Sequence, residues 1–168
     1  MKRVVIITGP GVQDEEFVYP YYRLKEAGVE VGVATWKNET VHGKYGVPIS
    51  PTIELRRLRP AAWDGVLLPG GLEAPDRLRQ ERTVLRFVSA MNSENKLVAG
   101  ICHGPWVMIS SGILAGRNAT CYVGMKDDLV NAGANYFDKP VVIDLNLITS
   151  PHYRNLPEFM AAVVEALA

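Results

Sequence analysis

Short apolar runs alternate with longer segments of helical apolar spacing along almost the whole chain. The runs are residues 3–8 (RVVIIT), 30–35 (EVGVAT), 65–70 (GVLLPG), 96–101 (KLVAGI), 141–144 (VVID) and 147–149 (LIT). Most of them are apolar on both faces, as strands of a parallel sheet must be when helices cover both sides. The alternation therefore predicts an α/β fold with a mostly parallel, doubly wound sheet.

The segments between these runs predict five helices. Residues 15–27 place Phe17, Tyr21 and Leu24 at helical spacing and are followed by Gly28, a residue type that commonly ends helices. Further helices are expected at 76–91, 104–114, 127–132 and 157–167, a hairpin or loop at 40–50, and a tight turn at 144–147.

Length, charge and cysteine content narrow the class of protein. A chain of 168 residues suits one domain, residues 1–168. Its 18 basic and 18 acidic residues cancel, and no Lys/Arg cluster contains interleaved aromatics, so a nucleic-acid partner is not expected. No apolar run approaches the ~20 residues that a membrane span needs. Two cysteines without a secretion signal favour free thiols in a reducing cytoplasm.

The stretch LVAGICHGPWVM, residues 97–108, leaves almost nothing to connect an expected strand to an expected helix, so Cys102 must lie in the turn. Gly100 and Gly104 remove side chains that would collide there, and Pro105 suits a first helical turn. This is the form of a nucleophile elbow. A thiol at a helix N-terminus is expected to have a lowered pKa, which makes Cys102 a candidate nucleophile. The alternative is a small buried apolar residue.

Neighbouring residues could complete such a site. His103 could take the thiol proton, although consecutive side chains often diverge and a purely helix-starting role stays open. Gly70 and Gly71 follow another expected strand, and the N–H groups of Gly71 and His103 could form an oxyanion hole. A tight turn with positive φ is the alternative for the glycine pair. Asp76, at an expected helix start, suits a helix cap from its local sequence.

These motifs together resemble the ThiJ/PfpI intracellular-protease-like family of the class I glutamine amidotransferase-like superfamily. DEEFVYPYYRLKEAG, LLPGG with APDRLR, ICHGPWVMISSGIL and DDLVNAGA occur in the family's order, over nearly the whole chain. The resemblance implies a flavodoxin-like three-layer sandwich, a nucleophile at Cys102 and an acid-base residue at His103. It implies that Asp76 reaches the site of a neighbouring subunit, in a homo-oligomer (dimer or hexamer) with the site at the interface. It also implies that Glu16 faces the cysteine, where it would be protonated.

Some positions depart from the family pattern and bear on the substrate. Many relatives have Glu where this chain has Asp76, and relatives commonly have an arginine where this chain continues with SPHYR. His152 in that segment is either a second imidazole near the cleft or an exposed loop residue. Tyr122 and Gly70 are candidate substrate-binding residues, whereas Cys121 is expected to serve packing.

The sequence contains no cofactor motif. No metal-ligand spacing, phosphate loop or dinucleotide fingerprint is present, so neither a metal nor a cofactor is expected. The resemblance implies a cysteine hydrolase or lyase acting on small reactive carbonyls or glycated adducts (glyoxalase-like or deglycase-like), or on peptides. Two alternatives remain open: a redox-sensing, stress-protective or chaperone-like protein without turnover, and a specialised pathway hydratase or lyase.

Overall fold

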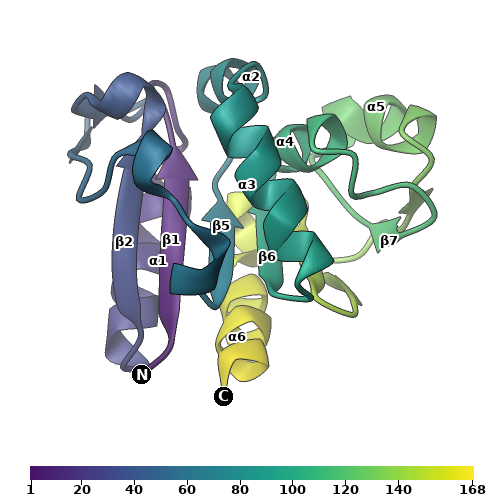
Figure 1. Cartoon of the computed structure of the whole chain (residues 1–168). Coiled ribbons are helices and arrows are strands. Elements are labelled where there is room, and N and C mark those ends of the chain that lie inside the picture. Colours follow the sequence, from purple (N-terminus) through teal and green to yellow (C-terminus); the bar gives the residue numbers. More distant parts are fainter.

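A six-stranded sheet forms the middle layer of the computed structural model, which describes residues 1–168 (Figure 1). The strand order is β2-β1-β5-β6-β10-β9. All neighbouring strands are parallel except β9 and β10, which are antiparallel. The expected mostly parallel, doubly wound sheet is confirmed. The strands are β1 (Arg3–Thr8), β2 (Glu30–Thr35), β5 (Gly65–Leu68), β6 (Leu97–Ile101), β9 (Val142–Asp144) and β10 (Leu147–Ser150).

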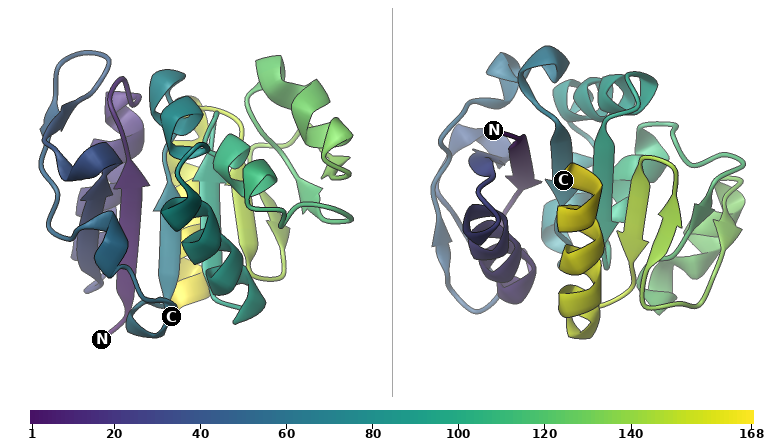
Figure 2. Two further views of the ribbon diagram at one scale, coloured as in Figure 1. Left: turned by 45° about the horizontal axis from the view of Figure 1, so that its top comes forward. Right: turned by 90° about the horizontal axis from the view of Figure 1, so that it is seen from below.

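Helices cover both faces of this sheet. The two-residue period of β1 sends Val4 and Ile6 into one core and Val5 and Ile7 into the other. The first core is closed by α1 and α6, which lie side by side in the view from below (Figure 2). The second is closed by α3, α4 and α5. The helices are α1 (Asp14–Glu26), α2 (Glu73–Leu78), α3 (Arg82–Ser93), α4 (Pro105–Ser110), α5 (Lys126–Asn131) and α6 (Leu156–Leu167).

The single helix expected at 76–91 is wrong, because α2 and α3 are separate helices. Residues 79–81 form a non-helical connection between the two helices. Buried side chains in α3 follow the i, i+3, i+4, i+7 rule from Val84 to Met91, but Leu78 lies six residues before Val84 and falls out of that phase. The break lets α2 pack against α4 while α3 packs on β5 and β6.

Smaller elements complete the chain. The expected hairpin at 40–50 is present as β3 (Val41–His42) and β4 (Pro48–Ile49), and Leu145, with a φ of +54°, makes the expected turn between β9 and β10. A separate pair is formed by β7 (Asn118–Ala119) and β8 (Asn135–Tyr136). Five short 3₁₀ turns lie at 36–38, 55–57, 60–62, 123–125 and 153–155.

Both sheet edges are restricted. At the outer edge of β2, the Val33 carbonyl accepts hydrogen bonds from the N–H groups of Thr52 (2.8 Å) and Ile53 (3.1 Å). The Thr52 hydroxyl accepts from the Val33 N–H at 2.9 Å. At the other edge, β9 has only three residues. None of the helices is both long and apolar enough to cross a lipid bilayer.

Parallel strands bring their carboxyl ends to one edge of the sheet, where ligands of open α/β folds bind. The chain segments that leave β1, β5, β6 and β10 all start at this edge. Figure 1 shows α2 near it, and both chain termini at the opposite end of the molecule.

Candidate active site

Cys102 lies in the turn between β6 and α4. Its φ is +59°, a left-handed conformation that a non-glycine residue rarely adopts. The bend is held from both sides, because the Cys102 N–H donates to the Ser150 carbonyl at 2.9 Å and the Tyr122 N–H donates to the Cys102 carbonyl at 3.0 Å. The expected sharp turn with an unusual backbone at the cysteine is confirmed.

Glycines make this close packing possible. A Cβ at Gly104 would collide with the Leu68 carbonyl oxygen, and one at Gly100 would come within 2.8 Å of the Met108 sulfur. A Cβ at Gly70 would lie 2.7 Å from the Cys102 Cβ. A larger residue at Gly104 or Gly70 would collide with main-chain atoms, whereas one at Gly100 would displace the Met108 side chain.

Glu16 is the acidic partner of the thiol. It projects from the first turn of α1, is 0% exposed, and its Oε2 accepts a hydrogen bond of 2.6 Å from the Gly70 N–H. Burial raises the pKa of Glu16 to about 8, and its carboxyl group is in hydrogen-bonding contact with the Cys102 thiol. Near pH 7 this carboxyl group therefore holds its proton.

The pKa of the Cys102 thiol is raised, first by burial and then by the charge of Glu16. The expected lowering by a helix dipole is therefore wrong: the residue is only 8% exposed and α4 has only six residues. The N–H groups of His103 and Gly71 hydrogen-bond the sulfur and act in the opposite direction, lowering the pKa. Each group disfavours ionisation of the other, so protonation of Glu16 removes its charge and makes ionisation of the thiol easier.

His103 contacts the sulfur although it is the next residue in the chain. Its Nδ1 lies 3.2 Å from the Cys102 Sγ. The ring is held between Trp106, at 4.9 Å between centroids and 60°, and Tyr122, at 4.7 Å and 30°. Burial lowers the pKa of His103, while the charge of Asp128 raises it. A neutral imidazole in this position can accept the thiol proton.

Asp128 is the acidic residue of the same chain whose charge acts on His103, and it was not identified from the sequence. Its Oδ2 accepts a hydrogen bond of 3.0 Å from the Trp106 indole N–H. Asp76 is exposed on α2 and does not line the cavity beside Cys102. It also lies at the fourth residue of α2, which begins at Glu73, so the helix-cap role suggested by its local sequence is wrong.

A cavity of about 570 Å³ opens beside the sulfur and contains most of the expected substrate-binding residues. Gly71 borders the cavity and has a φ of +76°, as expected for a tight turn. Its N–H also hydrogen-bonds the sulfur, so the turn and the donor role occur together. Gly70 does not border it, because the residue is buried and its N–H is used by Glu16. The lining is Gly11, Gln13, Lys44, Gly71, Leu72, Glu73, Cys102, His103, Tyr122, His152 and Tyr153.

His152 forms part of the cavity wall. Its Nδ1 accepts a hydrogen bond of 3.2 Å from the Arg154 N–H, which starts the 3₁₀ turn at 153–155. Its ring lies 4.1 Å from that of Tyr153 and 6.2 Å from that of Tyr122. Burial, followed by the charge of Arg154, lowers the pKa of His152. The residue thus caps a turn and also presents an imidazole to the cavity.

Lys44 and Glu73 border the cavity but were not identified from the sequence. Glu73 directly follows the Gly-Gly-Leu turn after β5, and this position at the carboxyl end of a strand was a usable signal. Lys44 comes from the hairpin, which had no visible link to Cys102. His42 in the same hairpin is exposed. Cys121 is fully buried, with its pKa raised to about 12 by burial, in agreement with the expected packing role.

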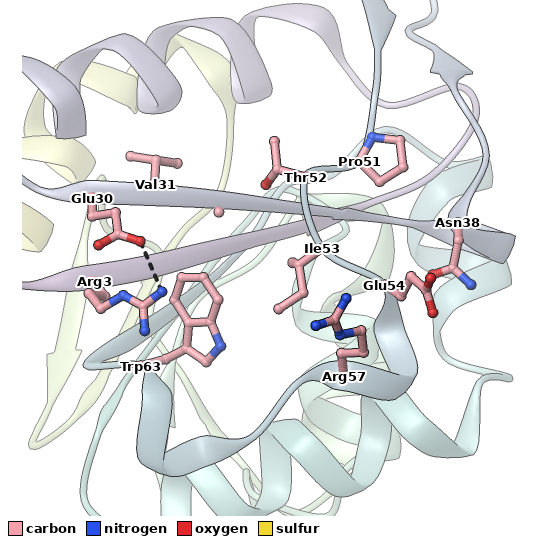
Figure 3. Close-up of a pocket in the computed structure, with 11 residues that line it drawn as sticks. Arg3, Glu30, Val31, Asn38, Pro51, Thr52, Ile53, Glu54, Arg57 and Trp63 are labelled. Atoms are coloured by element: carbon pink, nitrogen blue, oxygen red, sulfur yellow. Dashed lines mark hydrogen bonds and ion pairs between the residues drawn. The ribbon is translucent and has the colours of Figure 1, made fainter.

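The largest cavity, about 680 Å³, is remote from the cysteine and is bordered by the first residues of β1 and β2 (Figure 3). Its Arg3 is already paired with Glu30 at 2.9 Å and lies 4.7 Å from the centre of the Trp63 ring. The six-membered ring of that indole also packs against Gly32. No group of three or more His, Cys, Asp or Glu side chains in the molecule could hold a metal ion.

Comparisons with known proteins agree with this architecture. Residues 2–166 match the DJ-1/PfpI family. The chain is similar to a protein of Pyrococcus abyssi named deglycase (41% identity, 98% of this chain and 99% of the relative). It is also similar to deglycase PfpI of Pyrococcus furiosus (37% identity, 98% and 99%).

Two solved structures extend the comparison to the fold. The DJ-1beta structure of Drosophila melanogaster superposes with a TM-score of 0.93 at 34% identity, over 99% of this chain and 90% of that one. A two-domain protein of Anabaena variabilis, described as containing DJ-1/ThiJ/PfpI-like and ferritin-like domains, gives 0.97 at 38% identity over 99% of this chain. The chain spans 48% of that longer protein.

Proposed function

The chain belongs to the DJ-1/PfpI family, and from its site we propose that it is a cofactor-independent cysteine hydrolase or lyase acting on small reactive carbonyls or glycated adducts. The observation that carries the proposal is the set of groups around one sulfur. Nδ1 of His103 lies 3.2 Å from Sγ, a carboxyl group with a pKa of about 8 contacts it, and two N–H groups point at it. Relatives named deglycase support the same class of activity.

The geometry suggests how an α-oxoaldehyde would react. Sγ adds to the aldehyde carbon, forming a C–S bond as the carbonyl π bond breaks, and the thiol proton passes to the neutral imidazole of His103, whose Nδ1 lies 3.2 Å away. The N–H groups of Gly71 and His103, which now face the sulfur, stabilise the oxyanion. His103 returns the thiol proton to the oxyanion, which gives a hemithioacetal and a neutral imidazole. That imidazole then moves the C–H proton to the adjacent carbon, which gives a thioester and an alcohol. Water cleaves the thioester and restores the thiol, so one water is consumed and no external oxidant is needed.

The direct test is turnover by the purified wild type. With methylglyoxal we expect lactate in a one-to-one ratio to the carbonyl consumed, without added metal or nucleotide. The same assay on the methylglyoxal adduct of N-acetylarginine should release lactate and unmodified N-acetylarginine. A protein that is inert on both substrates, yet readily oxidised at Cys102, would contradict turnover and favour the redox-sensing alternative.

The proposal includes a homo-oligomer in which Asp76 of one copy reaches His103 of another. Its support is that Asp76 is exposed on α2, near the carboxyl edge of the sheet, yet is not part of its own chain's cavity. A reducing, cytoplasmic setting is also part of the proposal, since both thiols are free.

Two acids could therefore orient His103, and substitution separates them. Asp76→Asn should lower kcat/KM about tenfold or more while sedimentation still shows a dimer or larger assembly. Asp128→Asn should instead lower the pKa of His103, because a carboxylate that raises it is lost. The acidic limb of the kcat/KM profile should then move to lower pH.

The neighbouring exposed acid Asp127, in the same helix, provides the matched control, since Asp127→Asn should leave the profile in place. A wild type that is active as a monomer would contradict the shared site.

A further inference from the structure

A second hollow of about 550 Å³ adjoins the catalytic cavity. The two share three residues, Gly11, Lys44 and Glu73. Beyond these, the second hollow is bordered by Trp36 and Glu39, from the segment between β2 and β3, and by His42 of β3. The sulfur therefore lies in one half of a longer groove, and Lys44 and Glu73 stand where the halves meet.

Main-chain contacts hold the walls of this groove in place. The Gly11 N–H donates to the His42 carbonyl at 2.9 Å, and the Lys44 N–H donates to the Val12 carbonyl at 2.8 Å. From α1, the buried carboxylate of Asp14 accepts hydrogen bonds from the N–H groups of Tyr45 at 2.8 Å and Val47 at 3.0 Å. The hairpin is thus fixed against the loop after β1, so the second hollow is formed before any ligand binds.

The polar side chains of the second hollow are mixed in charge, and two of them, Glu39 and His42, have no partner within the chain. Glu39 and His42 are exposed and make no side-chain hydrogen bond or ion pair within the chain. Lys44 is exposed, whereas Glu73 is paired with Arg77 at 2.8 Å. The hollow thus combines two carboxylates, one ammonium group and one imidazole, a mixture that favours neither a polyanion nor a polycation. Free donors and acceptors beside each other suit the peptide group, which carries one of each.

The size of the groove also argues against a three-carbon substrate alone. Pockets that enclose drug-sized ligands measure roughly 300–1,000 Å³, and the catalytic cavity by itself is already within that range. We propose that the second hollow is a subsite for the polypeptide flanking a modified side chain, with Glu39 and His42 as specificity-determining residues. The inference rests on the proposed function and deepens it, because it makes peptidyl adducts preferred over free carbonyls.

The test compares methylglyoxal with two adducts of it, one on N-acetylarginine and one on the blocked pentapeptide acetyl-Ala-Ala-Arg-Ala-Ala-amide. The wild type should show a lower KM for the pentapeptide adduct than for the arginine adduct. In a Glu39→Ala, His42→Ala double variant, the ratio of kcat/KM for the pentapeptide adduct to that for methylglyoxal should fall about tenfold, mainly through KM. Arg57→Ala, in the remote cavity of Figure 3, is the control and should keep the wild-type ratio.

Equal KM values for the two adducts, or an unchanged ratio in the double variant, would overturn the subsite. If the wild type turns over nothing, the proposed function fails but the subsite remains testable by calorimetry. Cys102→Ser protein should then still bind the unmodified pentapeptide, and binding should weaken about tenfold in the triple variant that adds Glu39→Ala and His42→Ala. No binding by Cys102→Ser protein would overturn the subsite as well.

Discussion

Replacing Cys102 with serine is expected to lower kcat/KM for methylglyoxal by at least about a thousandfold. The hydroxyl is a much weaker nucleophile than sulfur at neutral pH. Nothing else beside the cavity can replace the sulfur, because Cys121 is buried in the core on the opposite face of the sheet. The measurement is steady-state lactate formation. Intact-mass spectrometry of quenched wild-type reactions should show the covalent adduct, and the serine variant should not.

Cys121→Ala is the matched control, since it removes the other thiol of the chain. Assayed well below its unfolding temperature, it should retain wild-type kcat/KM. A serine variant that kept more than a tenth of the wild-type rate would place the chemistry at another residue.

Glu16→Gln should change how stability depends on pH. The folded carboxyl group keeps its proton up to about pH 8, whereas its ordinary pKa is 4.5. Between these values the folded state binds more protons than the unfolded state, so this group's contribution to the free energy of unfolding is lost as the pH rises. From pH 5 to pH 8 the loss is on the order of 3 kcal/mol. Glutamine cannot titrate, so the variant should lack this decline.

The measurement is the free energy of unfolding in urea at pH 5 and pH 8. The difference between variant and wild type at each pH cancels the contributions of His103 and His152, which titrate in both proteins. Glu26→Gln, an exposed acid in the last turn of the same helix, is the control and should follow the wild type. If Glu16→Gln followed it too, Glu16 would be ionised throughout this pH range.

The sheet and the bend were predictable because they depend on local sequence. Runs that are apolar on both faces identified the buried strands, and the spacing of Gly100, Cys102, Gly104 and Pro105 identified the turn. The break between α2 and α3 was missed because no glycine or proline marks residues 79–81. Only the change of phase between Leu78 and Val84 indicates it, and that is visible once it is known which residues are buried.

The electrostatics of the site could not be read from motifs. A helix start after Cys102 indicated a lowered thiol pKa, but burial and Glu16 dominate, and both arise from tertiary packing. For the same reason the sequence linked neither Asp128 to His103 nor Lys44 to the cavity. Gly70 was predicted to contact substrate because it follows a strand at the carboxyl edge of the sheet. Its N–H is instead bonded to Glu16, 54 residues earlier, and that contact depends on the tertiary fold.

The protected margins of the sheet limit how copies of this chain can associate. Backbone pairing between subunits needs a free strand margin of useful length. Part of β2 is already occupied by Thr52 and Ile53, and β9 offers only three residues. The six-stranded sheet therefore offers little for edge-to-edge pairing, and we expect a homo-oligomer to use helix and loop surfaces instead. The same arrangement leaves little template for fibre growth.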